Sequence, residues 1–301
     1  MKFSIYQESR QGKRKNNEDR IGYSYSRDAL LMVLADGMGG HLQGEVAAHI
    51  AVQLLIEAFR NSAKPRLADP RDFLEDAMMR SHHAILDYAR ARKLPETPRT
   101  TCVACLVQDA TGYWAHVGDS RLYHLREGRI RTRTRDHSRV QQLVDLGRVR
   151  EEAAQLHPER NRLFNCLGSF SDPMVEHSLP CLLNTGDTLL LCSDGLWGPL
   201  SNNTILQAFA VGDVISAVPE LLNAAEARAG RDSDNLSAVA MGWAENESTV
   251  PHHITTGGLA SNTVTTRVED FINPGDSDMT DEEIEQAIAE IRDAIRRNTT
   301  N

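Results

Sequence analysis

Two short apolar runs, each followed by Asp-Gly, constrain the fold of this 301-residue chain more than any other feature. Residues 29–35 read A-L-L-M-V-L-A before Asp36-Gly37, and residues 188–192 read T-L-L-L-C shortly before Asp194-Gly195. A short apolar run that ends at turn-forming residues is typical of a buried strand. We therefore expect two buried strands, each ending in an Asp-Gly turn that holds an aspartate at a sheet edge.

The predicted strands come in groups that pairs of helices separate. Apolar residues at helical spacing predict helices at 43–60 and 71–93, and a second pair at 201–209 and 212–229. Strands are expected in the segments before, between and after these pairs, within 1–26, 100–125 and 236–242. Such grouping favours an α+β fold, in which helices cover sheet layers, over a regular βαβ winding.

Composition excludes several classes of protein. The chain is 41% hydrophobic and 25% charged, which is ordinary for a globular protein, and its net charge of −9 disfavours nucleic acid and anionic membranes as partners. No apolar run approaches the roughly 20 residues that span a bilayer, and the N-terminus lacks an apolar signal core. We therefore expect a cytoplasmic protein.

The cysteines do not suggest a disulfide framework. Their number, five, is odd and their spacing is irregular. Cys102 and Cys105 form a lone C-x-x-C within a predicted strand, where positions three apart point to opposite faces. We expect buried thiols there rather than a zinc or redox pair.

The composition changes after Trp243 and suggests three parts. We expect a folded domain at 1–243, a flexible polar linker at 244–279 and an amphipathic helix at 280–297. Thr280 and Glu283 form a capping box, and isoleucines and alanines at helical spacing give the helix one apolar stripe. This helix either docks on a partner such as a kinase or packs on its own domain.

Four aspartates lie at predicted strand ends: Asp19, Asp36, Asp194 and Asp234. Each could be an ordinary turn residue by itself. If they converge, their like charges raise one another's pKa, and a divalent cation is the usual compensation. Ligands that are all oxygens favour Mg²⁺ or Mn²⁺ over zinc.

Six motifs, in order along residues 1–243, resemble those of the metal-dependent protein phosphatases of type 2C. They are R-K-N-N-E-D (14–19), L-A-D-G-M-G-G-H (34–41), V-G-D-S-R (117–121), R-D-H-S (135–138), C-S-D-G-L-W (192–197) and D-N-L-S (234–237). The resemblance implies a four-layer α/β/β/α sandwich, in which helix pairs flank two mostly antiparallel sheets and the metal site lies at one sheet edge. It also implies hydrolysis of phosphoserine and phosphothreonine on proteins by direct attack of a metal-activated hydroxide, in opposition to a bacterial Ser/Thr kinase.

The same resemblance assigns roles to individual residues. Two Mn²⁺ or Mg²⁺ ions, and a third at a weaker site, would be held by carboxylates and one backbone carbonyl. Asp36 would bridge the first two ions, and the carbonyl of Gly37 would complete the shell of one of them. Asp194 and Asp234 would hold the first ion, Asp19 would lie on or near the second, and Asp119 with Asp194 would hold the third. Glu18 and Asn235 would support these ligands from outside the coordination shell. Arg14 would grip the substrate phosphate, a task that suits a guanidinium fork.

The chain departs from animal and plant members at Met38, where those carry a histidine proposed as the general acid. His41 is a candidate donor by proximity alone, and a structural role for it is favoured. Residues 139–185 correspond to the variable flap of the family. The arginines of 129–135 predict either a solvated strand face or a rim that attracts phosphopeptides. A catalytically weak scaffold that binds phosphoproteins is the alternative function, which the complete set of acids disfavours.

Overall fold

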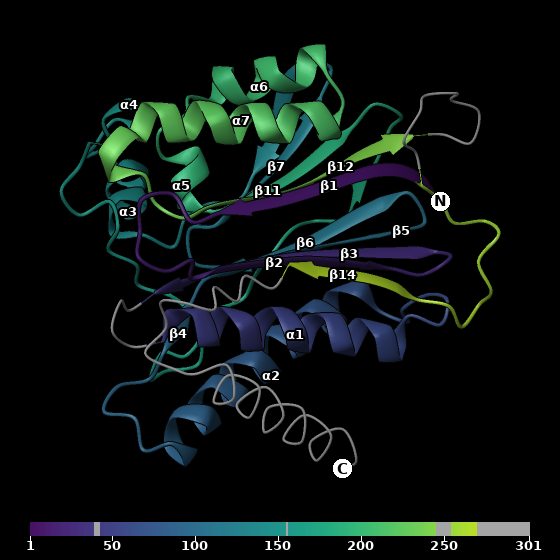
Figure 1. Cartoon of the computed structure of the whole chain (residues 1–301), viewed down its shortest axis with the longest axis horizontal. Helices are drawn as coiled ribbons and strands as arrows, with labels where there is room; N and C mark the ends of the chain where they lie inside the picture. Colours follow the sequence, from purple (N-terminus) through teal and green to yellow (C-terminus); the bar gives the residue numbers. More distant parts are fainter. Residues whose placement is uncertain (39–42, 155, 245–253, 270–301) are drawn as a thin grey trace.

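The computed structural model describes residues 1–38, 43–154, 156–244 and 254–269. Two sheets face each other, and a pair of helices covers the outer face of each, so the chain forms four layers (Figure 1). This arrangement confirms the expected α+β sandwich.

The named strands pair antiparallel throughout both sheets. The first sheet has the order β13 (Ile254–Thr255), β1 (Lys2–Arg10), β12 (Leu236–Ala244), β11 (Thr188–Cys192), β7 (Arg121–Arg126) and β8 (Arg129–Arg133). The second sheet has the order β10 (Cys181–Leu182), β6 (Thr111–Val117), β5 (Cys102–Gln108), β3 (Ala29–Met38), β2 (Asp19–Tyr25) and β14 (Thr265–Glu269). Two short strands complete it, β4 (Arg99–Thr100) beside β3 and β9 (Glu176–His177) beside β6.

The two predicted helix pairs are confirmed within a few residues. The outer layers are α1 (Gly44–Ser62) and α2 (Pro70–Ala91) on the second sheet, and α6 (Asn202–Val211) and α7 (Val214–Ala229) on the first. Shorter helices lie in connections: α3 (Arg139–Asp145), α4 (Glu151–Ala154), α5 (Asp194–Trp197) and the 3₁₀ turn η2 (Gly230–Asp232). Side chains cap several of these helices. Asp69, for example, accepts hydrogen bonds from the first backbone N–H groups of α2, and Pro70 occupies the first helical position.

Three hydrophobic clusters fill the spaces between the four layers. One lies between α1–α2 and the second sheet, one between the two sheets, and one between the first sheet and α6–α7. Cys102 packs in the first cluster and Cys105 in the second, which confirms that these two thiols point to opposite faces of β5 and are buried. Alternation along a strand therefore assigns neighbouring residues to different cores.

The segment predicted as a flexible linker contains two strands. β13 pairs with β1 and β14 pairs with β2, so each sheet gains an edge strand from this segment. Met1 also binds here, because its ammonium group donates a hydrogen bond to Thr256 Oγ1 at 2.8 Å. The segment is polar because edge strands form backbone hydrogen bonds with few buried side chains, and polarity alone does not reveal them. The predicted helix at 280–297 lies outside the described residues.

Among the described residues, no helix combines the length and the apolar composition needed to cross a bilayer.

Candidate metal centre

Asp19 and Asp36 lie directly opposite each other on the neighbouring strands β2 and β3. Opposed residues of an antiparallel pair place their side chains on the same face of a sheet. The expected turn at Asp36-Gly37 is wrong, because β3 continues through both residues to Met38. Gly37 instead allows the backbone of β3 to pack closely against neighbouring backbone. A Cβ there would lie 2.3 Å from the carbonyl oxygen of Gly44 and 2.8 Å from that of Glu18.

The second expected turn also has a different structure. Asp194 is the first residue of α5, directly after Ser193, so Asp194-Gly195 begins a helix. Gly195 packs against backbone, since a Cβ there would lie 1.9 Å from the carbonyl oxygen of Asn235. Both Asp-Gly pairs therefore bring backbone segments together, and this contact fixes the adjacent aspartates.

Asn235 joins the N-terminal loop to the start of β12. Its Nδ2 donates hydrogen bonds to the carbonyl oxygens of Gln11 and Asn16, and its Oδ1 accepts one from the N–H of Glu18 at 2.9 Å. Asp234, the preceding residue, accepts a hydrogen bond from Arg14 Nη2 at 2.6 Å. The structure thus brings the predicted residues Arg14, Glu18 and Asp234 to one place.

Asp119 reaches the same end of the sheets from the connection between β6 and β7. Trp197 Nε1 donates to its backbone oxygen at 3.0 Å. Thr101 links this connection to β3, because its Oγ1 accepts from the N–H of Asp36 at 3.1 Å and lies 2.7 Å from Ser120 Oγ. Thr101 was not predicted as a site residue, although the Thr-Thr pair at 100–101 begins a predicted strand.

The five aspartates Asp19, Asp36, Asp119, Asp194 and Asp234 form what we call the acid cluster. Burial raises the pKa of Asp36 and of Asp119 well above the usual value, and neighbouring charges, chiefly Asp19 and Asp194 respectively, raise them further. Burial followed by Asp234 raises the pKa of Asp194 to about 7. The cluster therefore has more negative charge than its protein surroundings compensate.

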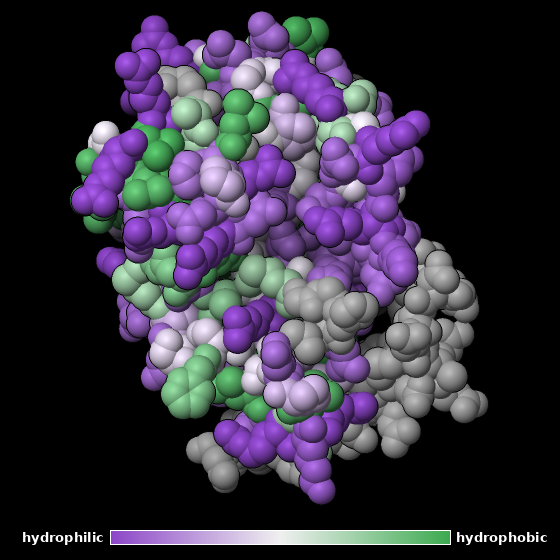
Figure 2. Space-filling model, turned by 90° about the vertical axis from the view of Figure 1, so that its left-hand side faces the viewer, coloured by the Kyte–Doolittle hydropathy of each residue, from purple (hydrophilic) through white to green (hydrophobic). Residues whose placement is uncertain are grey.

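Asp19 shows the same deficit in its hydrogen bonds. Its Oδ2 accepts from Ser193 Oγ at 2.8 Å, whereas its Oδ1 is buried with no hydrogen-bond partner among the described residues. Burial raises the pKa of Asp19 to about 6, and burial with the nearby Glu45 raises that of Glu18 to about 7. An orphaned carboxylate oxygen among crowded acids fits a hard divalent cation. The end of the molecule that carries the cluster is largely hydrophilic (Figure 2).

Outside the acid cluster, two histidine groups each bring three potential ligand atoms within 4.8 Å of one another, and they are the groups of described residues that do so: His82–His83–Asp172 and His116–His137–Glu176. In the second group, His137 Nδ1 accepts hydrogen bonds from the N–H of Gly118 and from Asn165, so its proton lies on Nε2, which faces Glu176 at 3.3 Å. His82 Nδ1 likewise accepts from the N–H of Gly168. The His137 nitrogen that faces Glu176 is therefore a donor, and His137 and His82 attach the flap by accepting hydrogen bonds from Asn165 and Gly168.

Acidic residues of the flap form ion pairs with arginines of the basic stretch 129–135. Arg133 pairs with Glu151 at 3.3 Å, and Arg135 pairs with Asp145. These contacts favour a structural role for the two arginines over a free phosphopeptide rim. His41 lies outside the described residues. Met38 ends β3, and its thioether has no proton to donate.

Replacing Gly195 with alanine is expected to lower the free energy of unfolding by about 2 kcal/mol or more, because the added Cβ meets the carbonyl of Asn235. Thermal unfolding of the metal-free protein measures this. Gly257→Ala is the matched control: nothing lies within 4 Å of its Cβ position, and a change of at most about 0.5 kcal/mol is expected. Equal stability of the two variants would contradict the tight packing inferred here.

Comparison with known proteins agrees with this geometry. The family described as Protein phosphatase 2C matches residues 7–233. The serine/threonine protein phosphatase PstP of Mycobacterium tuberculosis is 36% identical over 227 residues, which cover 75% of this chain and 42% of PstP. Among solved structures, the serine/threonine phosphatase of S. agalactiae has a TM-score of 0.73 at 29% identity and covers 81% of this chain and 100% of that one. The catalytic domain of PstP in complex with two manganese ions has a TM-score of 0.68 at 33% identity, with 81% and 99% covered.

Proposed function

Because the chain belongs to the protein phosphatase 2C family and is a metal-dependent serine/threonine protein phosphatase, we propose how its own residues carry out that reaction. The observation that carries the proposal is the acid cluster, in which Asp36 lies opposite Asp19 and their charges, with those of Asp194 and Asp119, raise the pKa of Asp36. The substrates that this assignment supports are proteins that carry phosphoserine or phosphothreonine.

The residues that would hold the ions are those of the acid cluster and one backbone carbonyl. Asp36 would be a ligand of both ions, and the carbonyl of Gly37 would be a ligand of one of them. Asp194 and Asp234 would hold the first ion, and Asp19 would serve on or beside the second. Asp119 would complete a third, weaker site with Asp194. When bound, Mn²⁺ or Mg²⁺ supplies positive charge that stabilises the transferring phosphoryl group and lowers the pKa of water. The orphaned Asp19 Oδ1 and the raised acid pKa values support this assignment.

Glu18 and Asn235 would position the ligands without contacting an ion. The backbone of Glu18 is held by Asn235, and the Glu18 carbonyl accepts a hydrogen bond from the N–H of Gly37 at 3.2 Å. Its carboxyl group, with a pKa of about 7, can exist in both protonation states near neutral pH. These contacts connect the N-terminal loop to β3, which carries Asp36, and to the start of β12, which Asp234 precedes.

Arg14 would bind the phosphate of the substrate. Its side chain is 59% exposed at the mouth of the cluster and is tied to Asp234 at 2.6 Å, so its guanidinium is already directed to the site. A guanidinium can bind two phosphate oxygens at once, which suits recognition of a phosphate dianion. The protein environment, chiefly the hydrogen bond that Arg14 donates to Asp234, raises the pKa of Arg14, so it remains charged.

Arg14→Ala is expected to raise KM for a phosphothreonine peptide by about 10- to 100-fold, as the loss of a charge-assisted hydrogen bond predicts. Arg14→Lys keeps the charge but removes the fork and should recover only part of the loss. Lys13→Ala, at the exposed neighbouring position, is the control and should leave KM unchanged. A manganese titration of each variant separates phosphate binding from altered metal affinity. An unchanged KM in Arg14→Ala would refute the role of Arg14.

The cellular setting extends the proposal. We place the enzyme in the cytoplasm, where it would reverse the action of a Ser/Thr protein kinase. The acids expected for catalysis are all present in the cluster, which supports an active enzyme over a catalytically weak scaffold. Manganese-dependent release of phosphate from a phosphothreonine peptide tests the function, and full activity in excess chelator would overturn it.

A further inference from the structure

Cys181 differs from the other four cysteines of the chain, which are all buried, because its side chain is partly exposed. Its Sγ lies 3.5 Å from His124 Nδ1, and His124 Nε2 lies 2.9 Å from Asp187 Oδ2. A nucleophile, a base and an orienting carboxylate are thus connected in series, the arrangement that activates nucleophilic side chains. None of the three residues belongs to the acid cluster.

Asp187 fixes which nitrogen of His124 accepts a proton. Burial would raise the pKa of Asp187, but hydrogen bonds from Arg126, Asn184 and His124 outweigh burial and lower it, so the carboxylate is ionised. It accepts from His124 Nε2, which therefore carries the proton in the neutral ring. The lone pair on Nδ1 then faces the thiol of Cys181, as a general base requires.

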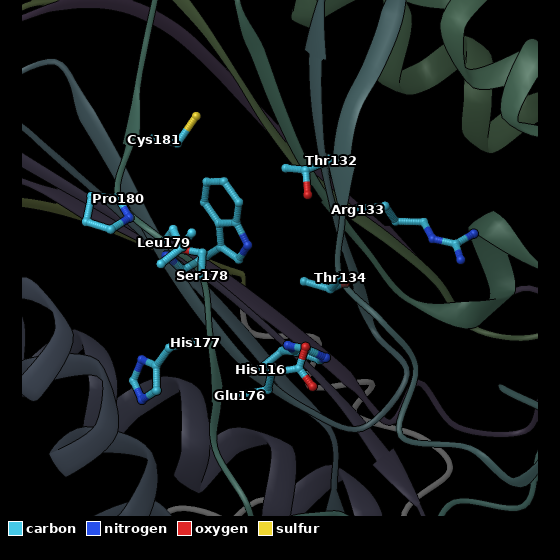
Figure 3. Close-up of a pocket in the computed structure, with 11 residues that line it drawn as sticks. His116, Thr132, Arg133, Thr134, Glu176, His177, Ser178, Leu179, Pro180 and Cys181 are labelled. Carbon is cyan, nitrogen blue, oxygen red and sulfur yellow. The ribbon is translucent and has the colours of Figure 1, made fainter. Parts of the chain in front are cut away.

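A pocket of about 410 Å³ adjoins this thiol. Its lining residues come from β6, from β8 and the residue after it, and from the segment that contains β9 and β10 (Figure 3). Cys181 and Pro180 lie at one end of this pocket, and His116 and Glu176 lie at the other. Cys181 is the thiol that lines the pocket.

Polar residues make up much of the lining of this pocket, among them His116, Thr132, Thr134, Glu176 and Ser178. His177 also belongs to the lining, but its ring points away from the pocket (Figure 3) toward α2, where its Nε2 lies 3.3 Å from Glu75 Oε2. The polar lining suits an occupant with hydrogen-bonding groups.

From this geometry we propose that Cys181 is a site of thiol–disulfide exchange, at which a small anionic disulfide leaves one half attached to the protein inside the pocket. This inference is independent of the phosphatase activity. In the exchange, His124 Nδ1 takes the proton of Cys181 as Sγ attacks one sulfur of the small disulfide. The disulfide bond of the small molecule breaks, a new S–S bond to Cys181 forms, and the leaving thiolate receives the proton from His124. One small thiol is released, and the small disulfide is the oxidant.

The preference for an anionic disulfide follows from the charges around the thiol. Burial raises the pKa of Cys181, and the charge of Asp187 adds to this, whereas Arg126 and Arg131 act electrostatically to lower it. The thiol is therefore protonated at rest and needs the base. Arg126 is committed to Asp187 at 2.6 Å, whereas Arg131 adds positive charge near the sulfur. A disulfide with carboxylates should approach faster than a cationic one.

The test is the rate at which the metal-loaded full-length protein forms a mixed disulfide with oxidised glutathione at pH 7. Mass spectrometry of the intact protein and of its peptides should show one glutathionyl group, on Cys181. Cys181→Ser should remove the adduct and leave phosphatase activity unchanged. The four buried cysteines serve as internal controls. No adduct, or an adduct on a different cysteine, would overturn the proposal.

His124→Asn tests the base, since it retains a polar group near the thiol but cannot accept the proton. The exchange rate at pH 7 should fall at least about tenfold, and the difference from wild type should shrink at alkaline pH, where the thiol ionises unaided. His83→Asn is the control at an exposed histidine. Equal rates in His124→Asn and wild type at pH 7 would overturn the role of His124. Cystamine, a cationic disulfide, should react more slowly than oxidised glutathione, and the reverse order would overturn the anionic preference.

Discussion

Replacement of Asp36 by asparagine is expected to reduce manganese-dependent hydrolysis of a phosphothreonine peptide by more than about 100-fold. Mutation of a residue that only supports a metal ligand typically lowers metal affinity or activity by about 10- to 100-fold. Asp36 is proposed as a ligand itself, so a larger loss is expected. It lies opposite Asp19, and the charges of Asp19, Asp194, Asp119 and Asp234 all raise its pKa. The measurement is released phosphate as a function of Mn²⁺ concentration, together with calorimetric titration of Mn²⁺.

The control for this substitution is Asp172→Asn, which removes a 77% exposed carboxylate outside the cluster and should leave activity and Mn²⁺ binding unchanged. Asparagine has nearly the shape of aspartate, and the backbone of Asp36 keeps its hydrogen bonds to Thr101. The variant should therefore fold, and in the absence of metal it should be at least as stable as the wild type, since one repelling charge is gone. Wild-type catalysis by Asp36→Asn would refute the assignment of Asp36 as a ligand.

The sequence predicted the members of the acid cluster but not the backbone geometry that holds them. Apolar runs identified β3 and β11, and the motifs identified Asp36 and Asp194. The expectation of two Asp-Gly turns was wrong because glycine permits close backbone approach as well as turning. The contacts that decide between these uses, Gly37 with Gly44 and Gly195 with Asn235, depend on the tertiary structure.

Polar residues that act through hydrogen bonds were harder to predict than charged ones. Thr101 and Ser193 hold Asp36 and Asp19, yet a hydroxyl residue beside a strand has many possible roles. The strands β13 and β14 were missed for a related reason, because an edge strand needs backbone partners more than apolar side chains. The local sequence pattern therefore predicts the hydrophobic core better than it predicts edge strands or the hydroxyl residues that hold the aspartates.

Repulsion between the carboxylates of the acid cluster destabilises the folded protein, and a bound metal ion would remove this repulsion. Its members come from separate parts of the chain, and hydrogen bonds from neighbouring polar side chains, rather than mutual attraction, hold them together. Asn235 fixes the N-terminal loop, Thr101 fixes β3, and Ser193 fixes Asp19. Folding without metal must therefore bring like charges together, and the penalty depends on how many of the acids are ionised.

Without metal, the free energy of unfolding is expected to fall by about 1–2 kcal/mol between pH 6.5 and pH 8. The pKa of Asp194 is raised from 3.8 to about 7, and that of Glu18 from 4.5 to about 7. In this pH range the folded protein still binds protons that the unfolded chain has lost, so stability is lost as pH rises through the folded pKa values. His116 and His137 have lowered pKa values, chiefly through burial, and act in the opposite direction, but mainly below this range. Urea unfolding in chelator at several pH values measures the slope.

Added Mn²⁺ should abolish or reverse this slope, because the ion binds the ionised acids and its affinity increases as they lose protons. Asp36→Asn should show a shallower slope in chelator, since one acid of the cluster can no longer ionise, whereas Asp172→Asn should match the wild type. A stability that rises with pH in chelator would show that the cluster is already neutralised by the protein itself. It would then remove the electrostatic basis for placing the metal ions there, even if the enzyme remained active.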